Sequence, residues 1–293
     1  MMTFDKNDAP ILIVLGQSNA HAHATQLPAG ERIETPLKNV HGLSREFNQY
    51  YDIDDVTWSG FTSGGMNLGE TQDHTCCLAN VFAAKWQAAI DAGEQLPDLY
   101  VIQVSIGGQG IAEFEVHGWN MWYAMREPKL KPGPFPEADI SLYPLTTNIL
   151  SLAMINLIAA GKRPRVIGLH WNHFETECHT GSRALNQAEE NYKNLFWGFF
   201  TALGSDQTGK GIPLYLYRPL TENYEPNRLE KMSALFDGFA STYADCRILD
   251  LRESGLYNDT PKTHGIFQND GIHYTPDAHR WFAERQWNDI FNK

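Results

Sequence analysis

The stretch that decides the fold reads ILIVLGQSN and covers residues 11–19. It begins with five consecutive aliphatic side chains between Pro10 and Gly16, which is typical of a strand buried on both faces of a parallel sheet. In open α/β sheets, ligands and reacting groups gather beyond the carboxyl ends of the strands. Ser18 is therefore placed where a nucleophile is useful, although an ordinary polar turn is the simpler interpretation of this serine taken alone.

Further apolar runs alternate with helical patterns along the chain. The expected strands cover residues 98–105, 165–171, 213–217 and 247–251, with a short one at 56–58, and the expected helices cover roughly 75–92, 143–161, 183–203, 227–243 and 276–291. The last helix has a typical start at Thr275-Pro276. This alternation predicts a single α/β domain over residues 1–293, with a mostly parallel sheet in a three-layer α/β/α sandwich.

Two stretches, near 20–75 and 108–142, do not fit the alternation and are expected to be long loop insertions. Loops longer than about 12–15 residues are uncommon unless they are functional or disordered. The second stretch is dense in aromatic residues, among them Trp119 and Trp122. Because disordered segments are usually poor in aromatics, these rings are expected either to form a binding wall or to pack the loop onto the domain.

The composition narrows the classes of partner. With 23 basic and 35 acidic residues the chain carries a net charge of −12, which disfavours nucleic acid and anionic membranes. No stretch approaches the roughly 18–20 apolar residues needed to span a bilayer. No signal peptide is visible, which fits a cytoplasmic protein, a phage-borne one, or a secreted one whose leader has been removed. The oligomeric state is not indicated.

The four cysteines are scattered, and two of them are adjacent. Their spacing matches neither a zinc site nor a disulfide framework, so they are expected to be reduced, mostly buried thiols. They are Cys76, Cys77, Cys178 and Cys246.

A serine nucleophile needs a base, an acid that orients the base, and donors for the oxyanion. Asp270 and His273 are three residues apart just before the last helix, so one loop can aim both at the same point. The alternative for this pair is a capping Asp and a surface His. Gly107-Gly108 follows an expected strand, and glycines there expose backbone N–H groups to a substrate. A phosphate-binding loop would end in Gly-Lys-Ser/Thr, which is absent.

The segment 170–179 also follows an expected strand and holds three His and two Glu residues. This density raises a metal hypothesis, but the spacing does not match a helical HExxH site. Acid–base or oxyanion duty is the favoured interpretation. His21 and His23 follow the serine block, where they either line the cleft or are simple loop residues.

Together these blocks resemble the SGNH (GDSL-like) hydrolases, and most closely the sialate O-acetylesterase and acetyl xylan esterase type of carbohydrate esterase. The resemblance spans nearly the whole chain, and its blocks are GQSN at 16–19, the pair Gly107-Gly108, and the DxxH of Asp270 and His273. It implies a flavodoxin-like fold, an acyl-enzyme mechanism and no metal or cofactor. In this mapping Gln17 and Asn19 support the nucleophile.

One block departs from the family pattern. That branch usually shows W-x-Q-G-E, whose Gln amide completes the oxyanion hole, whereas residues 171–175 here read WNHFE. His173 stands in the Gln position, and a neutral His can still donate one N–H. Asn172 could donate instead, and Glu175 is expected to orient the segment.

The resemblance implies a serine esterase that removes a small acyl group, such as acetyl, from a carbohydrate. Ser18 would attack, His273 would move the proton and Asp270 would hold His273. The backbone N–H of Ser18 would join Gly107 or Gly108 in holding the oxyanion, and Trp119, Trp122 and His21 are candidates for substrate contact. Two alternatives stay open. One is an esterase or thioesterase for lipid-like or small-molecule esters, and the other is a non-catalytic carbohydrate-binding module with the same fold.

Overall fold

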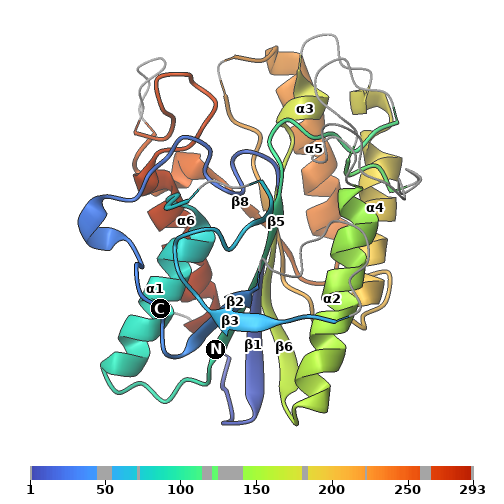
Figure 1. Ribbon diagram of the computed structural model, residues 1–293. Helices are drawn as coiled ribbons and strands as arrows, with labels where there is room; N and C mark the ends of the chain where they lie inside the picture. The colour runs from blue at the N-terminus through green and yellow to red at the C-terminus, as the bar shows by residue number, and fades with distance from the viewer. Residues whose placement is uncertain are drawn as a thin grey trace, which may run out of the picture.

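A central sheet organises the fold, and strand β1 (Asp8–Gly16) lies in its middle (Figure 1). The computed structural model describes residues 2–44, 55–70, 73–113, 121–124, 141–179, 184–221, 223–257 and 265–291. The strand order is β3-β2-β5-β1-β6-β7-β8, with β4 paired to β5, and every pair is parallel except β2 with β3. The other strands are β2 (Val40–Leu43), β3 (Trp58–Gly60), β4 (Leu68–Gly69), β5 (Leu99–Ser105), β6 (Arg163–Asn172), β7 (Leu214–Tyr217) and β8 (Cys246–Leu249).

Strand β1 is central because it is apolar on both faces. All of its nine residues are buried. Ile13 and Leu15 point into one hydrophobic core, and Leu12 and Val14 point into the other. Side chains alternate along a strand, so a run of consecutive aliphatic residues supplies both cores at once.

Helices cover both faces of the sheet. In Figure 1, α1 and α6 lie on one side, and α2, α4 and α5 lie on the other. The helices are α1 (Leu78–Asp91), α2 (Leu142–Ala159), α3 (Glu175–Cys178), α4 (Ala188–Ala202), α5 (Pro226–Thr242) and α6 (Pro276–Phe291), with 3₁₀ turns at Ala29–Glu31, Ala184–Asn186 and Leu251–Ser254. The predicted three-layer α/β/α architecture is confirmed, and each of the five predicted helices is present within a few residues of its expected bounds.

The stretch 20–75 is more ordered than the sequence indicates. It contributes β2, β3 and β4, which pair along one side of the sheet. The expected strand at 56–58 lies two residues later, as β3. These strands are only two to four residues long, too short for an alternating pattern to be recognised. Most of the stretch 108–142 lies outside the described residues.

Helix α2 is strongly apolar, and it begins and ends within two residues of its expected bounds. Its 18 residues have a mean hydropathy of 1.4, so by length and composition alone it could cross a membrane. Scattered Thr, Ser and Asn residues hide this helix from a search for an unbroken apolar run. In the fold its buried side chains, which include Leu145, Ile149 and Leu157, join the core beneath α4. The helix therefore fills a place in the covering layer.

Three strand ends meet at the upper edge of the sheet in Figure 1. Strand β1 lies between β5 and β6, and Gly16 pairs with Ser105 on one side and Asn172 on the other. Gly16 has a φ of +141°, and an added Cβ would lie 2.1 Å from the Asn172 carbonyl oxygen. Only glycine fits there, so the backbone of the serine block lies directly against the end of β6.

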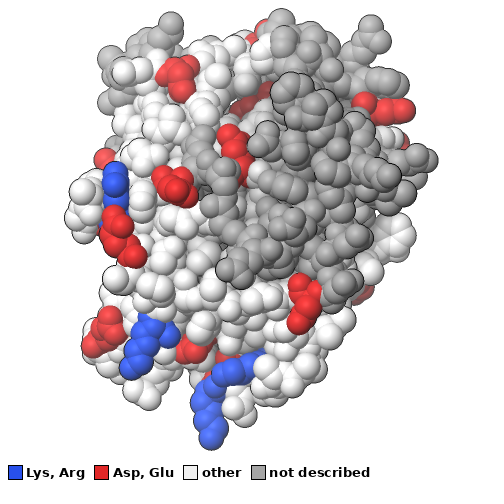
Figure 2. All heavy atoms as spheres, in the orientation of Figure 1, with Lys and Arg blue, Asp and Glu red and all other residues white. Residues whose placement is uncertain are grey.

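Charged side chains of both signs are scattered among the described residues on the face drawn in Figure 2. Figure 2 shows Lys and Arg side chains at separate places along the edges of one face, among scattered Asp and Glu. Some basic groups are paired with acids, as Arg163 is with Asp5 and Asp8. The expectation that nucleic acid is not a partner stays a prediction.

All four cysteines are free thiols, as predicted, and three of them are buried.

Candidate active site

Ser18 lies just beyond the carboxyl end of β1, in a turn fixed by backbone hydrogen bonds. Gln17 N–H donates to the Asn172 carbonyl (3.3 Å), and His23 N–H donates to the Ser18 carbonyl (2.8 Å). The Ser18 residue is 9% exposed. Within the described part of the chain its hydroxyl is not hydrogen-bonded to His273, and catalytic pairs often tighten only when substrate is bound.

A buried carboxylate holds the two side chains that flank Ser18. Glu175 Oε2 accepts from Gln17 Nε2 at 2.7 Å, and Glu175 Oε1 accepts from Asn19 Nδ2 at 2.6 Å. Thr176 completes the arrangement by donating its hydroxyl to Gln17 Oε1 (2.9 Å). Burial raises the pKa of Glu175, although hydrogen bonds, that from Asn19 first, pull it down. Glu175 thus contacts the serine block itself, rather than only its own segment.

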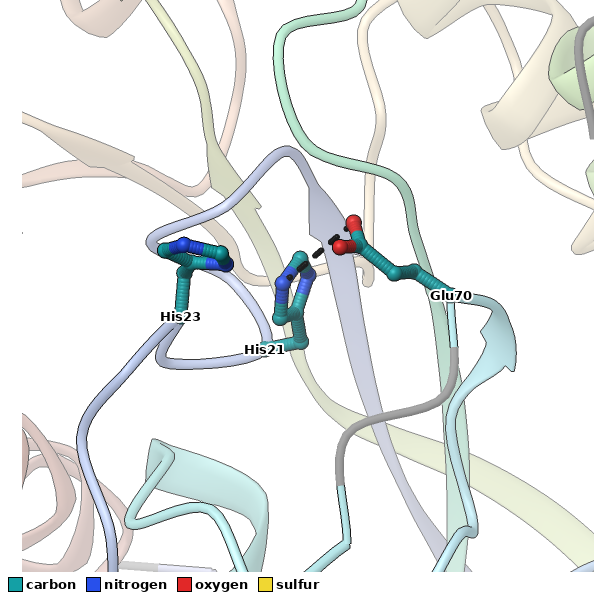
Figure 3. A group of neighbouring side chains, drawn as sticks. All are labelled: His21, His23 and Glu70. Carbon is teal, nitrogen blue, oxygen red and sulfur yellow. Dashed lines mark ion pairs between the residues drawn. The ribbon is translucent and has the colours of Figure 1, made fainter.

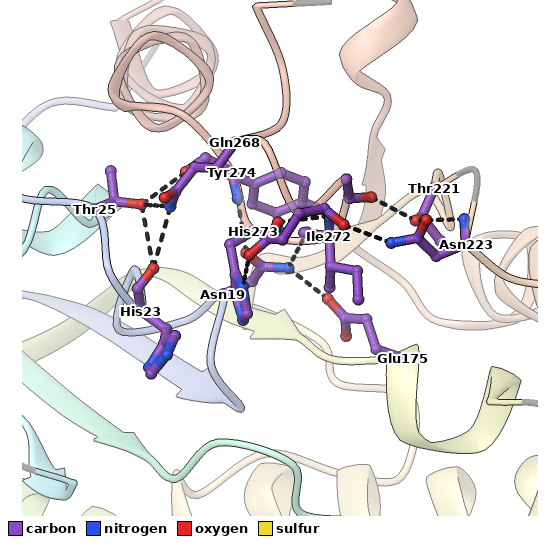
Figure 4. A network of polar contacts seen from close by, with 12 residues as sticks. Asn19, His23, Thr25, Glu175, Thr221, Asn223, Gln268, Ile272, His273 and Tyr274 are labelled. Atoms are coloured by element: carbon purple, nitrogen blue, oxygen red, sulfur yellow. Dashed lines mark hydrogen bonds and ion pairs between the residues drawn. The ribbon is translucent and has the colours of Figure 1, made fainter. Parts of the chain in front are cut away.

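Asn19 connects the serine block to the loop that carries Asp270 and His273. Its Nδ2 also donates to the Ile272 carbonyl (3.0 Å), and its Oδ1 accepts from the Tyr274 backbone N–H (3.0 Å). These two contacts bracket His273 in sequence (Figure 4). The amide of Asn19 therefore places the histidine loop over the end of β1.

The predicted acid and base are paired. His273 Nδ1 lies 2.6 Å from Asp270 Oδ2, while Asp270 Oδ1 accepts the backbone N–H groups of Ile272 and His273 at 2.9 and 3.0 Å. Partial burial raises the pKa of Asp270, but the hydrogen bonds from His273 and the backbone outweigh it, so the net pKa lies below its ordinary value. An ionised Asp270 on Nδ1–H leaves the other ring nitrogen, Nε2, as the proton acceptor.

The histidine loop is supported from a strand end that the sequence analysis did not consider. After β7, Thr221 donates its hydroxyl to the Gly271 carbonyl (2.7 Å), and Asn223 Nδ2 donates to the Asp270 carbonyl (2.6 Å). Short polar residues just after an apolar strand were the available signal, since reacting loops gather at that edge.

The expected oxyanion donors after β5 are partly occupied. Gly107 N–H donates to Glu70 Oε2 at 2.7 Å. A Cβ added to Gly107 would lie 3.6 Å from Ser18 Cβ, so this glycine does adjoin the nucleophile. A substrate oxygen can use the Gly107 N–H only by replacing the Glu70 carboxylate. Gly108, the other candidate, is exposed, with a φ of +68°.

His173 is buried and hydrogen-bonded to other groups, so the structure lends no support to its predicted role as an oxyanion donor. The side chain is fully buried: Nε2 lies 2.6 Å from the Gln109 carbonyl, and Nδ1 lies 3.1 Å from the Tyr192 hydroxyl and 3.1 Å from Glu177 Oε2. The Nε2 proton is therefore committed to Gln109. Burial lowers the pKa of His173 to about 4, so it is neutral at pH 7.

Asn172 alternates with Trp171 and His173 and so faces the other side of β6. Its side chain is buried, and its Oδ1 has no hydrogen-bond partner among the residues that the structure describes. Asn172 remains the candidate for the third oxyanion donor, and that role stays a prediction.

The metal hypothesis for 170–179 finds no support in how the side chains lie. His170 faces away from His173: its ring contacts the Tyr217 hydroxyl (2.8 Å) and Gln286 Oε1 (2.9 Å) on the α6 side of the sheet. The two imidazoles thus lie on opposite sides of the sheet and do not share a ligand position.

Trp122 is not a sugar-stacking platform, which corrects the expectation for this ring. It is 0% exposed, packs edge-on against Trp171 with ring centroids 5.0 Å apart, and donates its N–H to the Gly16 carbonyl (3.0 Å). It packs its segment onto the domain, which was the other expected outcome. Trp119 lies outside the described residues.

His21 is buried directly behind the serine block. It is 1% exposed, and its ring lies between Ser105 and Glu70. Glu70 itself was not predicted, because it follows the two-residue strand β4 and no motif surrounds it. No sequence pattern therefore indicates Glu70, the carboxylate that accepts the Gly107 N–H.

Buried neutral histidines predict that acid destabilises the fold. Burial lowers the pKa of His21, His170 and His279 to about 3, and that of His173 to about 4, from 6.5. Below about pH 6.5 these histidines bind protons in the unfolded chain but not in the folded chain. Their contribution to the free energy of unfolding is therefore complete above that pH and is lost as the pH falls. Each histidine contributes up to about 1.4 kcal/mol per pH unit.

We therefore expect the urea midpoint of unfolding to drop steadily from pH 7 to pH 5. His279→Leu tests the contribution of one such imidazole without removing a hydrogen bond, because both ring nitrogens of His279 lack a partner within the described residues. This variant should show a shallower pH dependence. A midpoint that stays constant over this range would contradict the assignment of neutral buried imidazoles.

Glu175→Gln tests whether Glu175 holds the serine block and the histidine loop in position. One oxygen acceptor becomes an NH₂ donor facing an amide donor of Gln17 or Asn19, so the serine block and the histidine loop should shift relative to each other. Misplacement by about 1 Å can cost about 10²-fold, and we expect a fall in kcat of that order for an ester substrate. Glu189→Gln, on the exposed surface of α4, is the control. Equal kcat for the two variants would show that Glu175 does not position the site.

Comparisons with known proteins agree with the architecture. No protein-family model matches the chain, and no curated protein sequence matches it. Among solved structures, the fold is similar to NanS, with a TM-score of 0.63 and 15% identity over 99% of this chain and 100% of that one. It is also similar to a protein from Arabidopsis thaliana, with a TM-score of 0.57 and 13% identity over 97% and 99%. At these identities the similarity establishes the fold.

Proposed function

We propose that this protein is a serine esterase that removes an acetyl group from a carbohydrate hydroxyl through an acyl-enzyme. The observation that carries the proposal is the paired Asp270 and His273, whose loop Asn19 ties to the block containing Ser18. Hydrogen bonds from Asn19 thus tie the segment of Ser18 to a loop far away in sequence, and this contact supports a shared site. The resemblance of these blocks to the SGNH carbohydrate esterases supports the acetylated carbohydrate as substrate.

The proposed reaction has two halves. The Ser18 hydroxyl oxygen attacks the ester carbonyl carbon while its proton passes to His273 Nε2, and the tetrahedral oxyanion is held by N–H donors. The bond to the sugar oxygen then breaks, and that oxygen takes the proton from His273. A water molecule attacks the acyl-Ser18 ester and gives its proton to His273. Acetic acid leaves as the Ser18 hydroxyl re-forms.

Substrate class is tested with a panel of esters. Initial rates on O-acetylated sialic acid and acetylated xylan should exceed rates on acyl esters of eight or more carbons, measured as acetate or fatty acid released. A preference for the long-chain esters would favour the alternative of a lipid or small-molecule esterase. Ser18→Ala, assayed beside the wild type, separates enzymatic release from spontaneous hydrolysis.

Two contacts favour the non-catalytic alternative. The Gly107 N–H is occupied by Glu70, and His173 is engaged elsewhere, so two of the expected oxyanion donors are committed. A carbohydrate-binding module with this fold would bind acetylated glycans without releasing acetate. Calorimetric binding of the panel by the wild type, combined with release rates equal to those of Ser18→Ala, would support the module and reject the esterase.

A further inference from the structure

Beside the serine block, His21, His23 and Glu70 bring their side chains together (Figure 3). Each offers one nitrogen or oxygen ligand atom, and these atoms all lie within 4.8 Å of one another. His21 Nε2 lies 3.5 Å from Glu70 Oε2. His21 is buried, whereas His23 and Glu70 are half-buried, so the cluster is partly open to solvent.

Hydrogen bonds behind His21 determine which of its ring nitrogens carries the proton. Asn67 Nδ2 donates to the carbonyls of Glu70 (2.9 Å) and Ser105 (3.1 Å), which fixes the orientation of that amide. Its Oδ1 therefore accepts the Ser105 hydroxyl proton (3.1 Å). The Ser105 oxygen is then left to accept from His21 Nδ1–H, at 3.2 Å. In the neutral ring Nε2 is consequently unprotonated and presents its lone pair.

This arrangement places two acceptors against each other. His21 Nε2 faces the Glu70 carboxylate, and within the described residues it has no hydrogen-bond partner although it is buried. A buried acceptor without a partner is costly, and an opposing anionic oxygen adds to the cost. A cation bound between the two ligand atoms would satisfy both groups at once.

We propose that His21 Nε2, one imidazole nitrogen of His23 and a carboxylate oxygen of Glu70 bind a single divalent transition-metal ion of the zinc type. Two imidazoles and one carboxylate are the ligand set of open, three-ligand sites. Tetrahedral ligands about 2.0–2.1 Å from a metal are separated by about 3.4 Å, close to the His21–Glu70 distance. The ligand nitrogen of His23 lies within 4.8 Å of the other two ligand atoms, and binding of an ion would require this half-buried side chain to move closer.

The orientation of His21 matches that of a metal-bound histidine. Such residues donate their second ring N–H to an oxygen that fixes the ring, and Ser105 supplies this oxygen. Asn67 holds both Ser105 and the backbone of Glu70, so one side chain sets the positions of two ligands. The site adjoins the proposed catalytic centre: the rings of His23 and His273 are 4.8 Å apart, and Glu70 contacts Gly107. The proposal does not depend on the esterase.

Zinc binding to the full chain tests the site directly. After dialysis against EDTA, titration with Zn²⁺ in competition with a chromophoric chelator should show one ion per chain. We expect Glu70→Gln and His23→Ala to bind at least about 100-fold more weakly, and Ser105→Ala about 10- to 100-fold more weakly. Asp98→Asn is the matched control, because it alters another His–carboxylate pair, that of His41, whose Nε2 lies 3.0 Å from Asp98.

Cobalt supplies a second, spectroscopic readout of the site. Co²⁺ in the wild type should give the intense visible absorption of a low-coordinate site, and this band should be lost in Glu70→Gln but kept in Ser18→Ala and Asp98→Asn. Retention in Ser18→Ala separates metal binding from the esterase, whose activity that variant removes. Failure to bind one equivalent of zinc, or equal affinity in wild type, Glu70→Gln and His23→Ala, would overturn the proposal.

Discussion

We expect Ser18→Ala to lower kcat for p-nitrophenyl acetate by about 10⁶-fold, which leaves only the catalysis that binding and oxyanion donors provide. The proposed reaction begins at the Ser18 oxygen, and an alanine at this position cannot form the acyl-enzyme. Because the hydroxyl makes no hydrogen bond to His273 within the described structure, its loss should leave the thermal midpoint of unfolding almost unchanged. Stopped assays at saturating ester, with melting curves on the same samples, measure both quantities.

Ser241→Ala is the matched control. Ser241 is an exposed residue of α5, and its hydroxyl donates to the Asp237 carbonyl of the same helix (2.9 Å). This variant should retain full activity. If Ser18→Ala also retained it, the hydrolysis would come from another group and the assignment of the nucleophile would be wrong.

The second large effect is expected for Asp270→Asn, with a fall in kcat of about 10⁴-fold. An amide keeps the size of the side chain but removes the charge that stabilises a protonated His273. It can also turn an NH₂ group toward His273 Nδ1, which is 2.6 Å away, and so favour the wrong tautomer. KM should change little, because Asp270 is not expected to contact the substrate.

Asp277→Asn controls for this substitution. Asp277 lies in the first turn of α6 and pairs with Arg280 at an exposed position. It should keep the activity of the wild type. A kcat for Asp270→Asn within about 10-fold of the wild type would indicate that His273 works without an orienting acid. Removal of the orienting acid from a triad is expected to lower kcat far more.

The fold was predictable where the physical signal is local and repeated. The aliphatic run before Gly16 marks a strand covered on both faces, and the helical spacings mark its covering layers. The β2, β3 and β4 strands escaped prediction because two to four residues give no readable period. Their stability comes from pairing with β5 and with each other, which is a tertiary effect.

The site was predictable where one short segment carries the chemistry. Asp270 and His273 share a loop, so their spacing alone indicates a pair. The direction of a side chain across a sheet is harder to read, because β6 contains a register irregularity opposite β1 and its last residues alternate between cores. The motif pattern places His173 among the oxyanion donors, although its ring packs against Tyr192 of α4. For Trp122 the sequence leaves open a binding wall or packing onto the domain, and the ring is buried.

Contacts between distant segments were beyond sequence reasoning. Glu70 approaches His21 and Gly107 only because β4 pairs beside β5, and no local pattern encodes that meeting. The proposed metal site therefore departs from the resemblance, which implied no metal. At this position Glu70 can contact either a cation bound at His21 or the backbone N–H of Gly107.

The central claim is that Ser18 is an activated nucleophile, and covalent labelling tests it most directly. Purified protein is incubated with a fluorophosphonate, and the labelled residue is located by intact mass and peptide mass spectrometry. We predict one adduct per chain, on Ser18, absent from Ser18→Ala and formed much more slowly in Asp270→Asn. No adduct on the wild type, or an adduct that persists in Ser18→Ala, would contradict the account.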